Sequence, residues 1–174
     1  DFWRIERKNL QRQFAQKIEQ NLAKGDIQHF SVFALAPQPL LIEFGCLLGD
    51  IAFADVYQKH REPETWSWLQ GEHFPEFIVS KPEHSSGSTV ALNLSLSADI
   101  ENPRITQVLG DDVSMWKLSV PRPNPNLIKL KKQLVEFRLV FRSLLNQIKK
   151  LHGQEAVLHI FPAVPLSVAV EIGR

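Results

Sequence analysis

Residues 29–57, HFSVFALAPQPLLIEFGCLLGDIAFADVY, carry the pattern that decides the fold class. The Val, Phe and Ala content of residues 29–36 predicts a buried strand, and residues 51–57 predict a second one. Two prolines end the first strand and open a helix over residues 40–48, which Gly49 is placed to end in a left-handed conformation. Because two strands joined through a helix usually run parallel, this segment favours an α/β fold with a mainly parallel sheet.

The stretch before this segment predicts a leading helix over residues 1–26. Apolar residues recur at every fourth position from Leu10 through Phe14 and Ile18 to Leu22, with charged and amide residues between them. This spacing is typical of an amphipathic helix, and Gly25 follows as its expected end.

Beyond residue 57, strands and helices continue to alternate. We expect strands at residues 76–80, 90–97, 113–120 and 156–161, and helices at residues 127–151 and 165–173. Within residues 90–97, Leu alternates with Asn and Ser, which predicts a strand with one buried side. Residues 31–40 and 158–166 both run from a strand through a proline turn into a helix, which suggests one such unit per half. The polar turn of residues 84–89 is the predicted boundary between a first half, residues 27–86, and a second half, residues 87–174.

The composition of the chain limits the classes of protein to which it can belong. The chain has 174 residues, 44% of them hydrophobic, which is enough for a buried core. Lys and Arg number 20 against 19 Asp and Glu, so we expect neither a globally basic clamp for nucleic acid nor an acidic tail, while local charged patches stay open. A single cysteine, Cys46, allows no internal disulfide and fits a reducing compartment. No apolar run is long enough to span a bilayer and the first residues do not resemble a signal peptide, so we expect a soluble, cytoplasmic protein.

Catalytic signatures are missing from the sequence, so we predict no catalytic residue, no metal and no cofactor. Glycine-rich phosphate loops and nucleophile elbows are absent, and the six histidines do not fall at a metal-ligand spacing. The carboxylate pairs Asp111-Asp112 and Glu62 with Glu64 read as solvated surface, because both lie in polar loop-like stretches. Cys46 lies among apolar residues and is predicted to be a small buried hydrophobe.

The strand exits hold the most informative residues. Ligands of open parallel sheets bind outside the carboxyl ends of the strands. The residues at these predicted ends are Pro37, Gln38, Pro39, Gln58, Lys59, His60, Arg61, Lys81, Phe161, Pro162 and Ala163. The helix starts that follow the prolines would direct free N–H groups and a positive dipole end to the same rim, which suits a phosphate. Trp66 and Trp68 follow closely and offer flat faces on which a base could stack.

These groups together are what a nucleotide-binding site requires, although a purely structural interpretation stays open. In that interpretation Trp66 and Trp68 anchor a loop on the core and the cations are solvated. The basic stripe of the long helix, Lys131, Arg138 and Arg142 with Lys149, leaves a similar choice. It is either a solvated face or a contact surface for an acidic partner or for DNA held by that partner.

Several stretches together resemble one known family, the SAVED domain. They are FALAPQPLLI at residues 33–42, LGD at residues 48–50, YQKHREP at residues 57–63 with WSW at residues 66–68, and FPAVPLSVAVEIGR at residues 161–174. The resemblance spans residues 28–174. It implies two fused Rossmann-like halves, akin to CARF domains, that bind a cyclic di- or trinucleotide made by a partner synthase, a CD-NTase.

The resemblance further implies a sensor of the bacterial CBASS anti-phage response. Ligand binding would drive self-association and activate a fused effector, here an endonuclease of the HNH type, in the bacterial cytoplasm and without a membrane. No nuclease signature is present, so the chain looks like the sensor without its effector, and the family's usual further strand after the Gly-Arg pair is missing.

Mapped onto this sequence, the resemblance makes Pro37, Gln38 and Pro39 one wall of the site and Phe161, Pro162 and Ala163 the opposing wall. Gln58, Lys59, His60 and Arg61 would contact phosphates or base edges, and Trp66 would stack on a base. Lys81 and Trp116 are further candidates, chosen from position only. The alternative function is a ring nuclease that degrades its cyclic ligand, with His60 and His159 as the first residues to substitute.

Overall fold

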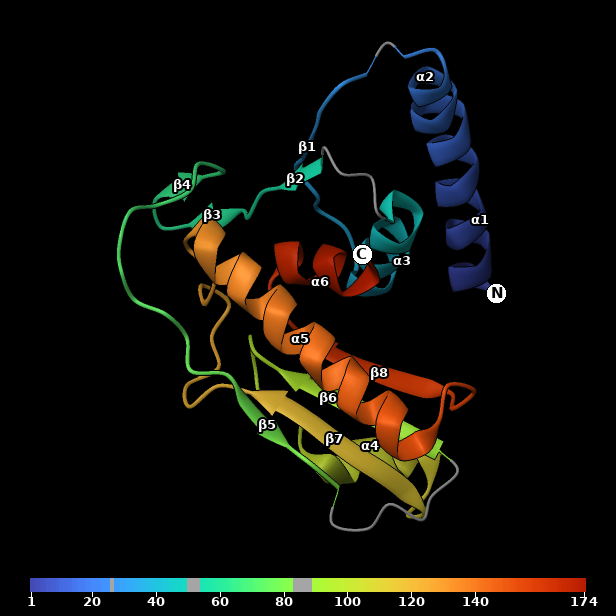
Figure 1. Ribbon diagram of the computed structural model, residues 1–174, viewed down its shortest axis with the longest axis vertical. Coiled ribbons are helices and arrows are strands. Elements are labelled where there is room, and N and C mark those ends of the chain that lie inside the picture. Colours follow the sequence, from blue (N-terminus) through green and yellow to red (C-terminus); the bar gives the residue numbers. More distant parts are fainter. Residues whose placement is uncertain (26, 50–53, 83–88) are drawn as a thin grey trace. The chain divides into compact units, whose positions relative to one another are not determined.

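The computed structural model describes residues 1–25, 27–49, 54–82 and 89–174 of a mixed α/β protein (Figure 1). The chain divides into two compact units: a first unit of Asp1–Trp68 with Leu166–Arg174, and a second unit of Leu69–Pro165. The boundary predicted at residues 84–89 lies almost wholly outside the described residues.

The first unit is built around a strand–helix–strand segment. In chain order it contains α1 (Phe2–Phe14), the π-helical η1 (Ala15–Glu19), α2 (Gln20–Ala23), β1 (Phe30–Val32), α3 (Gln38–Leu48), β2 (Ala54–Val56), β3 (His60–Arg61), β4 (Glu64–Thr65) and α6 (Leu166–Gly173). β1 pairs with β2 in parallel, as the strand–helix–strand pattern predicts. The prediction that Gly49 ends α3 is also confirmed, since its φ is 49°.

The leading helix is confirmed as a continuous helical stretch through α1, η1 and α2. It ends near Gly25, whose φ of 76° favours a residue without a side chain. Its apolar stripe packs on α3, where Phe14 meets the edge of Phe44 with ring centroids 6.0 Å apart. Polar contacts add to this, because the Gln11 amide donates to the Glu43 carboxylate at 2.7 Å.

Two glycines allow α3 and α6 to pack closely. A Cβ added at Gly45 would collide with the carbonyl oxygen of Val170, and one at Gly173 would collide with the carbonyl oxygen of Ile42. The helix predicted at residues 165–173 is confirmed as α6. Because Gly45 and Gly173 have no side chain, the backbone of α6 lies directly against α3. Because a two-stranded sheet is only marginally stable, this helix pair is a main source of stability for the first unit.

The second unit contains a four-stranded mixed sheet in the order β5-β7-β6-β8. Its elements are β5 (Ile78–Ser80), β6 (Thr89–Ser95), α4 (Asn102–Leu109), β7 (Val113–Ser119), α5 (Lys131–His152) and β8 (Leu158–Ala163). β6 runs parallel to both β7 and β8, whereas β5 is antiparallel to β7. The predicted strands and the long helix are confirmed, but the sheet is mixed rather than wholly parallel.

The prediction that the strand of residues 90–97 has one buried side is wrong. Ala91, Asn93 and Ser95, on the side predicted to be solvated, all have 0% exposure. The physical reason is that β6 is central and that α4 and α5 cover opposite faces of the sheet (Figure 1). α4 was not predicted, and its Asn-Pro start and closing Gly110 were the overlooked signals.

The long helix begins four residues later than predicted. Gln133 Oε1 accepts the backbone N–H groups of Lys129 and Leu130 at 2.7 and 3.0 Å, which fixes the start of α5 after Leu130. The apolar stripe faces the sheet: Leu134, Phe137, Phe141, Leu144 and Ile148 are buried. Gly153, with φ 86°, ends the helix as expected.

Candidate functional site

Four aromatic rings gather at the carboxyl ends of β1 and β2 in the first unit, and we call them the aromatic cluster: Phe33, Tyr57, Trp66 and Trp68. Phe33 directly follows β1 and Tyr57 directly follows β2. Their rings are stacked, with centroids 4.7 Å apart and an interplanar angle of 17°. Because parallel neighbours end at the same edge of a sheet, the cluster occupies the place where ligands of such sheets bind.

The two tryptophans reach the cluster through a short hairpin, β3 paired antiparallel with β4. Trp66 meets Phe33 edge-on with centroids 5.4 Å apart, and Trp68 stacks on Tyr57 at 6.2 Å. Trp66 and Trp68 are half-buried and Phe33 is 53% exposed, so part of the cluster faces solvent. The cluster therefore presents aromatic surface to a ligand while its rings support one another.

Two cations lie on the segment that leads from β2 into the β3–β4 hairpin. Lys59 Nζ lies 2.8 Å from Glu64 Oε1 and 5.8 Å from the centroid of the Trp66 ring. The hydrogen bond from Lys59 lowers the pKa of Glu64, so its carboxylate is charged at neutral pH. Arg61 is exposed and, among the residues that the structure describes, forms no ion pair. Arg61 is thus the cation open to an anionic ligand.

Gln58 is buried, and its side chain is fully used inside the first unit. Its Oε1 accepts the N–H of Ser167 at 3.1 Å and the Ser167 hydroxyl at 2.7 Å, and its Nε2 donates to the Lys59 carbonyl at 2.8 Å. Gln58 therefore joins the first turn of α6 to the loop after β2. It also occupies one of the α6 N–H groups that were expected to face a phosphate.

His60 is 3% exposed, and its ring meets Trp68 edge-on at 6.2 Å. The buried imidazole of His60 thus supports the aromatic cluster at Trp68.

At the start of α3, the Pro37 carbonyl accepts the N–H groups of Leu40 and Leu41 at 3.0 and 3.2 Å. Pro37 and Pro39 are exposed there and Gln38 is half-buried between them, on the turn where the sequence places them.

The remaining predicted residues belong to the second unit. Lys81 is exposed just after β5, and Phe161, Pro162 and Ala163 are the last, half-buried residues of β8. Trp116 is only 1% exposed and its indole N–H donates to His152 Nε2 at 3.0 Å. Its ring is part of the core and has no free face for a ligand, so Trp116 is left out of the proposed site.

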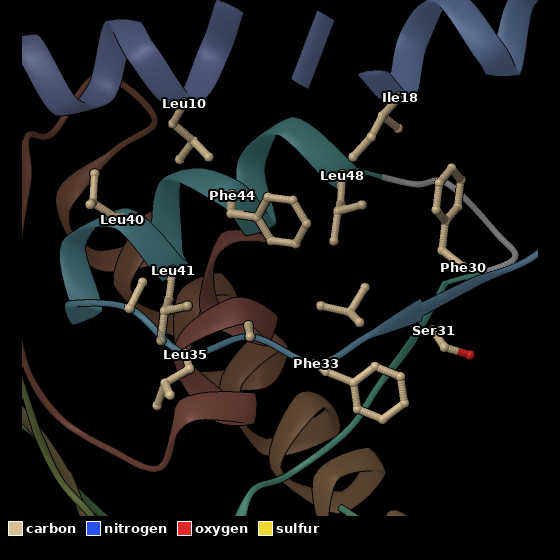
Figure 2. Close-up of a pocket in the computed structure, with 13 residues that line it drawn as sticks. Leu10, Ile18, Phe30, Ser31, Phe33, Leu35, Leu40, Leu41, Phe44 and Leu48 are labelled. Carbon is tan, nitrogen blue, oxygen red and sulfur yellow. The ribbon is translucent and has the colours of Figure 1, made fainter. Parts of the chain in front are cut away.

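An apolar pocket of the first unit does not suit a phosphate. Figure 2 shows Leu10 and Ile18 of the leading helix above α3, whose Phe44 and Leu48 line the middle of a cavity of about 380 Å³. Among its described lining residues, Ser31 carries the only polar side chain. Burying a charged group there without partners would be strongly unfavourable, so we exclude this pocket as the site of an anionic ligand.

Two further predictions concern reactive groups. Cys46 is exposed, so its predicted burial is wrong, because it lies on the side of α3 opposite the buried Leu41, Gly45 and Leu48. Partial desolvation and the nearby Glu43 raise the pKa of the Cys46 thiol, which keeps it protonated and weakly nucleophilic at neutral pH. Across residues 1–25, 27–49, 54–82 and 89–174, no group of three or more His, Cys, Asp or Glu side chains could hold a metal ion.

The basic stripe of α5 has an exposed apolar companion. Lys131, Arg142 and Lys149 are exposed, and Leu139 between them is 60% exposed. The role of this basic stripe as a contact surface for a partner stays a prediction.

Of the described helices, none is both long and apolar enough to cross a membrane.

Comparison with known families identifies the chain. A family model described as the SMODS-associated and fused to various effectors sensor domain, SAVED, matches residues 10–174. The chain belongs to the SAVED family. SAVED domains are sensor domains of effectors, and their general role is to sense cyclic oligonucleotides. No curated protein matches the chain.

Sequence reasoning missed Phe33 and Tyr57 as members of this SAVED domain's candidate site. Both are apolar enough to be read as strand interior. The available signal was their position, since each immediately precedes a group of predicted site residues at a strand exit.

Proposed function

We propose that this SAVED domain binds a cyclic di- or trinucleotide, with the aromatic cluster, Lys59 and Arg61 as its recognition surface. The observation that carries the proposal is the stacked cluster at the carboxyl ends of two parallel strands, with the exposed Arg61 on the hairpin that leads to Trp66. Base–aromatic stacking contributes about 1–3 kcal/mol per base, and a charge-assisted hydrogen bond to a phosphate about 1.5–3 kcal/mol. Bases and phosphates thus each have a suitable partner on this surface.

The proposed binding surface is positioned from behind by buried groups. Gln58 ties the loop that carries Lys59 and Arg61 to α6, and His60 supports Trp68. Preorganisation of this kind reduces the ordering cost of binding. Gln58 and His60 are therefore positioning residues in the proposal, and Pro37, Gln38 and Pro39 shape the start of α3.

The chain order supports a Rossmann-like origin for the second unit. β6 connects through α4 to β7 on one side, and β7 connects through α5 to β8 on the other side of β6, with both connected strands parallel to it. This order, with helices on both faces, is typical of doubly wound folds. We propose that β1, α3 and β2 form the corresponding core of a second Rossmann-like, CARF-like half.

The remaining proposals follow from the family. The messenger is made by a CD-NTase synthase, its binding promotes self-association, and the domain activates a fused endonuclease in anti-phage defence. Binding without turnover is proposed, because no nucleophile with a positioned base is present among the described residues.

Thermal unfolding with a panel of cyclic di- and trinucleotides tests the proposal, since a ligand specific for the folded state raises the melting temperature. Trp66→Ala should weaken the binding of the active ligand by about 1–3 kcal/mol. Trp3→Ala, which removes a tryptophan 51% exposed on α1, is the matched control and should leave affinity unchanged. No stabilisation by any member of the panel would contradict the proposal.

Chromatography of the ligand after hours of incubation separates binding from hydrolysis. Intact cyclic ligand is the expected result. Linear products that disappear on substitution of His60 or His159 would instead support a ring nuclease.

A further inference from the structure

The last helix, α6, is hydrogen-bonded to the segment around β2 at both of its ends. At its start, Gln58 Oε1 accepts the backbone N–H and the hydroxyl of Ser167. At its end, Arg174 Nη1 donates to the Ala54 carbonyl at 3.1 Å. Ala54 begins β2, and Gln58 lies two positions beyond the end of that strand. The two contacts therefore hold β2 before and after its length.

The Arg174 contact lies on an edge of β2 that carries no strand. Within the described part of the chain, β1 and β2 form a sheet of two strands, so each strand has one edge without a strand partner. The Tyr57 N–H donates to the Val32 carbonyl of β1 at 2.9 Å. Because successive residues of a strand direct their backbone groups to opposite edges, the Ala54 carbonyl, three positions earlier, points away from β1. Arg174 thus supplies the donor that a neighbouring strand would otherwise provide.

Arg174 also binds two other groups of the first unit. Its Nε donates to the Gly49 carbonyl at 3.4 Å, at the C-terminal end of α3, where the helix dipole favours a cation. Its Nη1 lies 3.4 Å from Glu171 Oε1 of α6, and the two side chains are only 14% and 1% exposed. One planar guanidinium thus joins α3, β2 and α6, and the ammonium of a lysine has no comparable fork of donors.

The position of β2 determines the position of the aromatic cluster. Tyr57 directly follows β2 and lies between the two points at which α6 is bonded. Its ring stacks on Phe33 with centroids 4.7 Å apart and on Trp68 with centroids 6.2 Å apart. Tyr57 therefore belongs to both stacked pairs, and a displacement of β2 would disturb the whole stacked surface.

We infer that Arg174 is a positioning residue: paired with Glu171, it fixes the start of β2 and thereby the aromatic rings to which the proposed function assigns the messenger. The inference rests on the proposed function, but it requires no contact between Arg174 and the messenger and uses the first unit alone. Coupling between two places in a protein is reciprocal, so binding at the aromatic cluster should in turn stabilise the end of α6.

The first test needs no ligand. Fluorine NMR of the chain labelled with fluorotryptophan gives one signal for each of the four tryptophans, which single substitutions assign. Arg174→Met should shift the signals of Trp66 and Trp68 and leave that of Trp116, in the core of the second unit, in place. Arg7→Met is the matched control, because it removes an arginine of α1 that pairs with a carboxylate of α3 at 3.0 Å. This control should leave Trp66 and Trp68 in place.

The second test is titration with the cyclic di- or trinucleotide of the panel that stabilises the wild type most. Arg174→Met should weaken its binding about 5- to 50-fold, a typical magnitude of coupling between sites, and Arg7→Met should bind like the wild type. Arg174→Met also destabilises the first unit, because it removes the cation beside the buried Glu171 carboxylate. The double variant Glu171→Gln, Arg174→Met removes both charges, so its stability should recover while its affinity stays low.

Two results would overturn the inference. If the double variant regains the affinity of the wild type, or if Arg174→Met leaves the signals of Trp66 and Trp68 in place, Arg174 has only a structural role. The proposed function still stands in that case if Trp66→Ala loses affinity. If the wild type binds no cyclic nucleotide, the proposed function is wrong, and the fluorine signals alone decide whether Arg174 positions the aromatic cluster.

Discussion

The two units use their parallel strands in different ways. In the first unit, β1 and β2 form a sheet of only two strands, and exposed aromatic rings gather at its end. In the second unit, β6 is covered on both faces and its buried Asn93 and Ser95 hold the loop at Ile100, which forms one wall of a pocket of about 440 Å³. The carboxyl ends of parallel strands can thus present an exposed stacking surface in a two-stranded sheet. In a sheet that helices cover on both faces, the same ends can form a preformed pocket.

The units also differ in what holds them together. The first unit depends on the close contact of α3 with α6, because its small sheet buries little. The second unit depends on a continuous core between α5 and the sheet, where Trp116, Phe137 and Leu144 are at most 1% exposed. Substitutions in one unit should therefore act differently from substitutions in the other.

The largest expected effect is from Gly45→Ala. The added methyl group would meet the backbone carbonyl of Val170, which no side-chain rearrangement can relieve, so the cost should be about 3 kcal/mol or more. Hydrogen exchange should show loss of protection in α3 and α6 while β6 and α5 stay protected. Cys46→Ala, at the exposed neighbouring position of the same helix, should leave exchange unchanged. Equal loss of protection in both units would contradict the contrast between them.

Arg61→Ala tests the open surface of the first unit. The loss of a charge-assisted hydrogen bond to a phosphate should weaken ligand binding by about 1.5–3 kcal/mol, measured by titration calorimetry. The melting temperature without ligand should barely change, because Arg61 is exposed. If stability falls and affinity does not, Arg61 is structural.

Asn93→Ala tests the rigid wall of the second unit. Removal of this side chain leaves the buried Ile100 carbonyl without its donor at 2.8 Å, which should lower the free energy of unfolding by about 1–3 kcal/mol. Asn146→Ala, at an exposed position of α5, is the matched control and should lower it by less than about 0.5 kcal/mol. Equal denaturant midpoints for both variants would show that the buried network does not hold the loop.

The smallest expected effect is from Glu64→Gln. This change removes the carboxylate that competes with a phosphate for Lys59 at 2.8 Å, so affinity should rise by a few-fold and depend more steeply on salt. Because the hydrogen bond from Lys59 lowers the pKa of Glu64, the difference from the wild type should disappear only at a pH below the usual range of glutamate. Unchanged affinity would show that Lys59 does not contact the ligand.

Local patterns predicted much of the fold. The strand–helix–strand segment, the stripe of the leading helix and the glycines that end α3 and α5 are all visible in the sequence, because they depend on neighbouring residues alone. The predicted carboxyl ends of the strands also indicated most of the residues around the aromatic cluster. The hairpin that brings Trp66 and Trp68 there is too short to leave a periodic pattern.

Other features could not be predicted because they depend on distant segments. The alternation in residues 90–97 suggests a solvated face, but α4 covers that face and buries Asn93 and Ser95. Gln58 looks like a ligand contact in sequence, yet Ser167, 109 positions away, takes its oxygen. Trp116 likewise resembles a stacking residue until His152 and the core enclose it.

The sequence by itself determined the order and type of most elements and the family to which the chain belongs, since periodicity and turn residues act over a few positions. The tertiary structure alone decided which polar side chains are satisfied internally and which remain open to a ligand. That choice separates Gln58, whose side chain is satisfied by Ser167 and Lys59, from the exposed Arg61. Hydrogen-bond partners and burial depend on segments that meet only when the chain has folded.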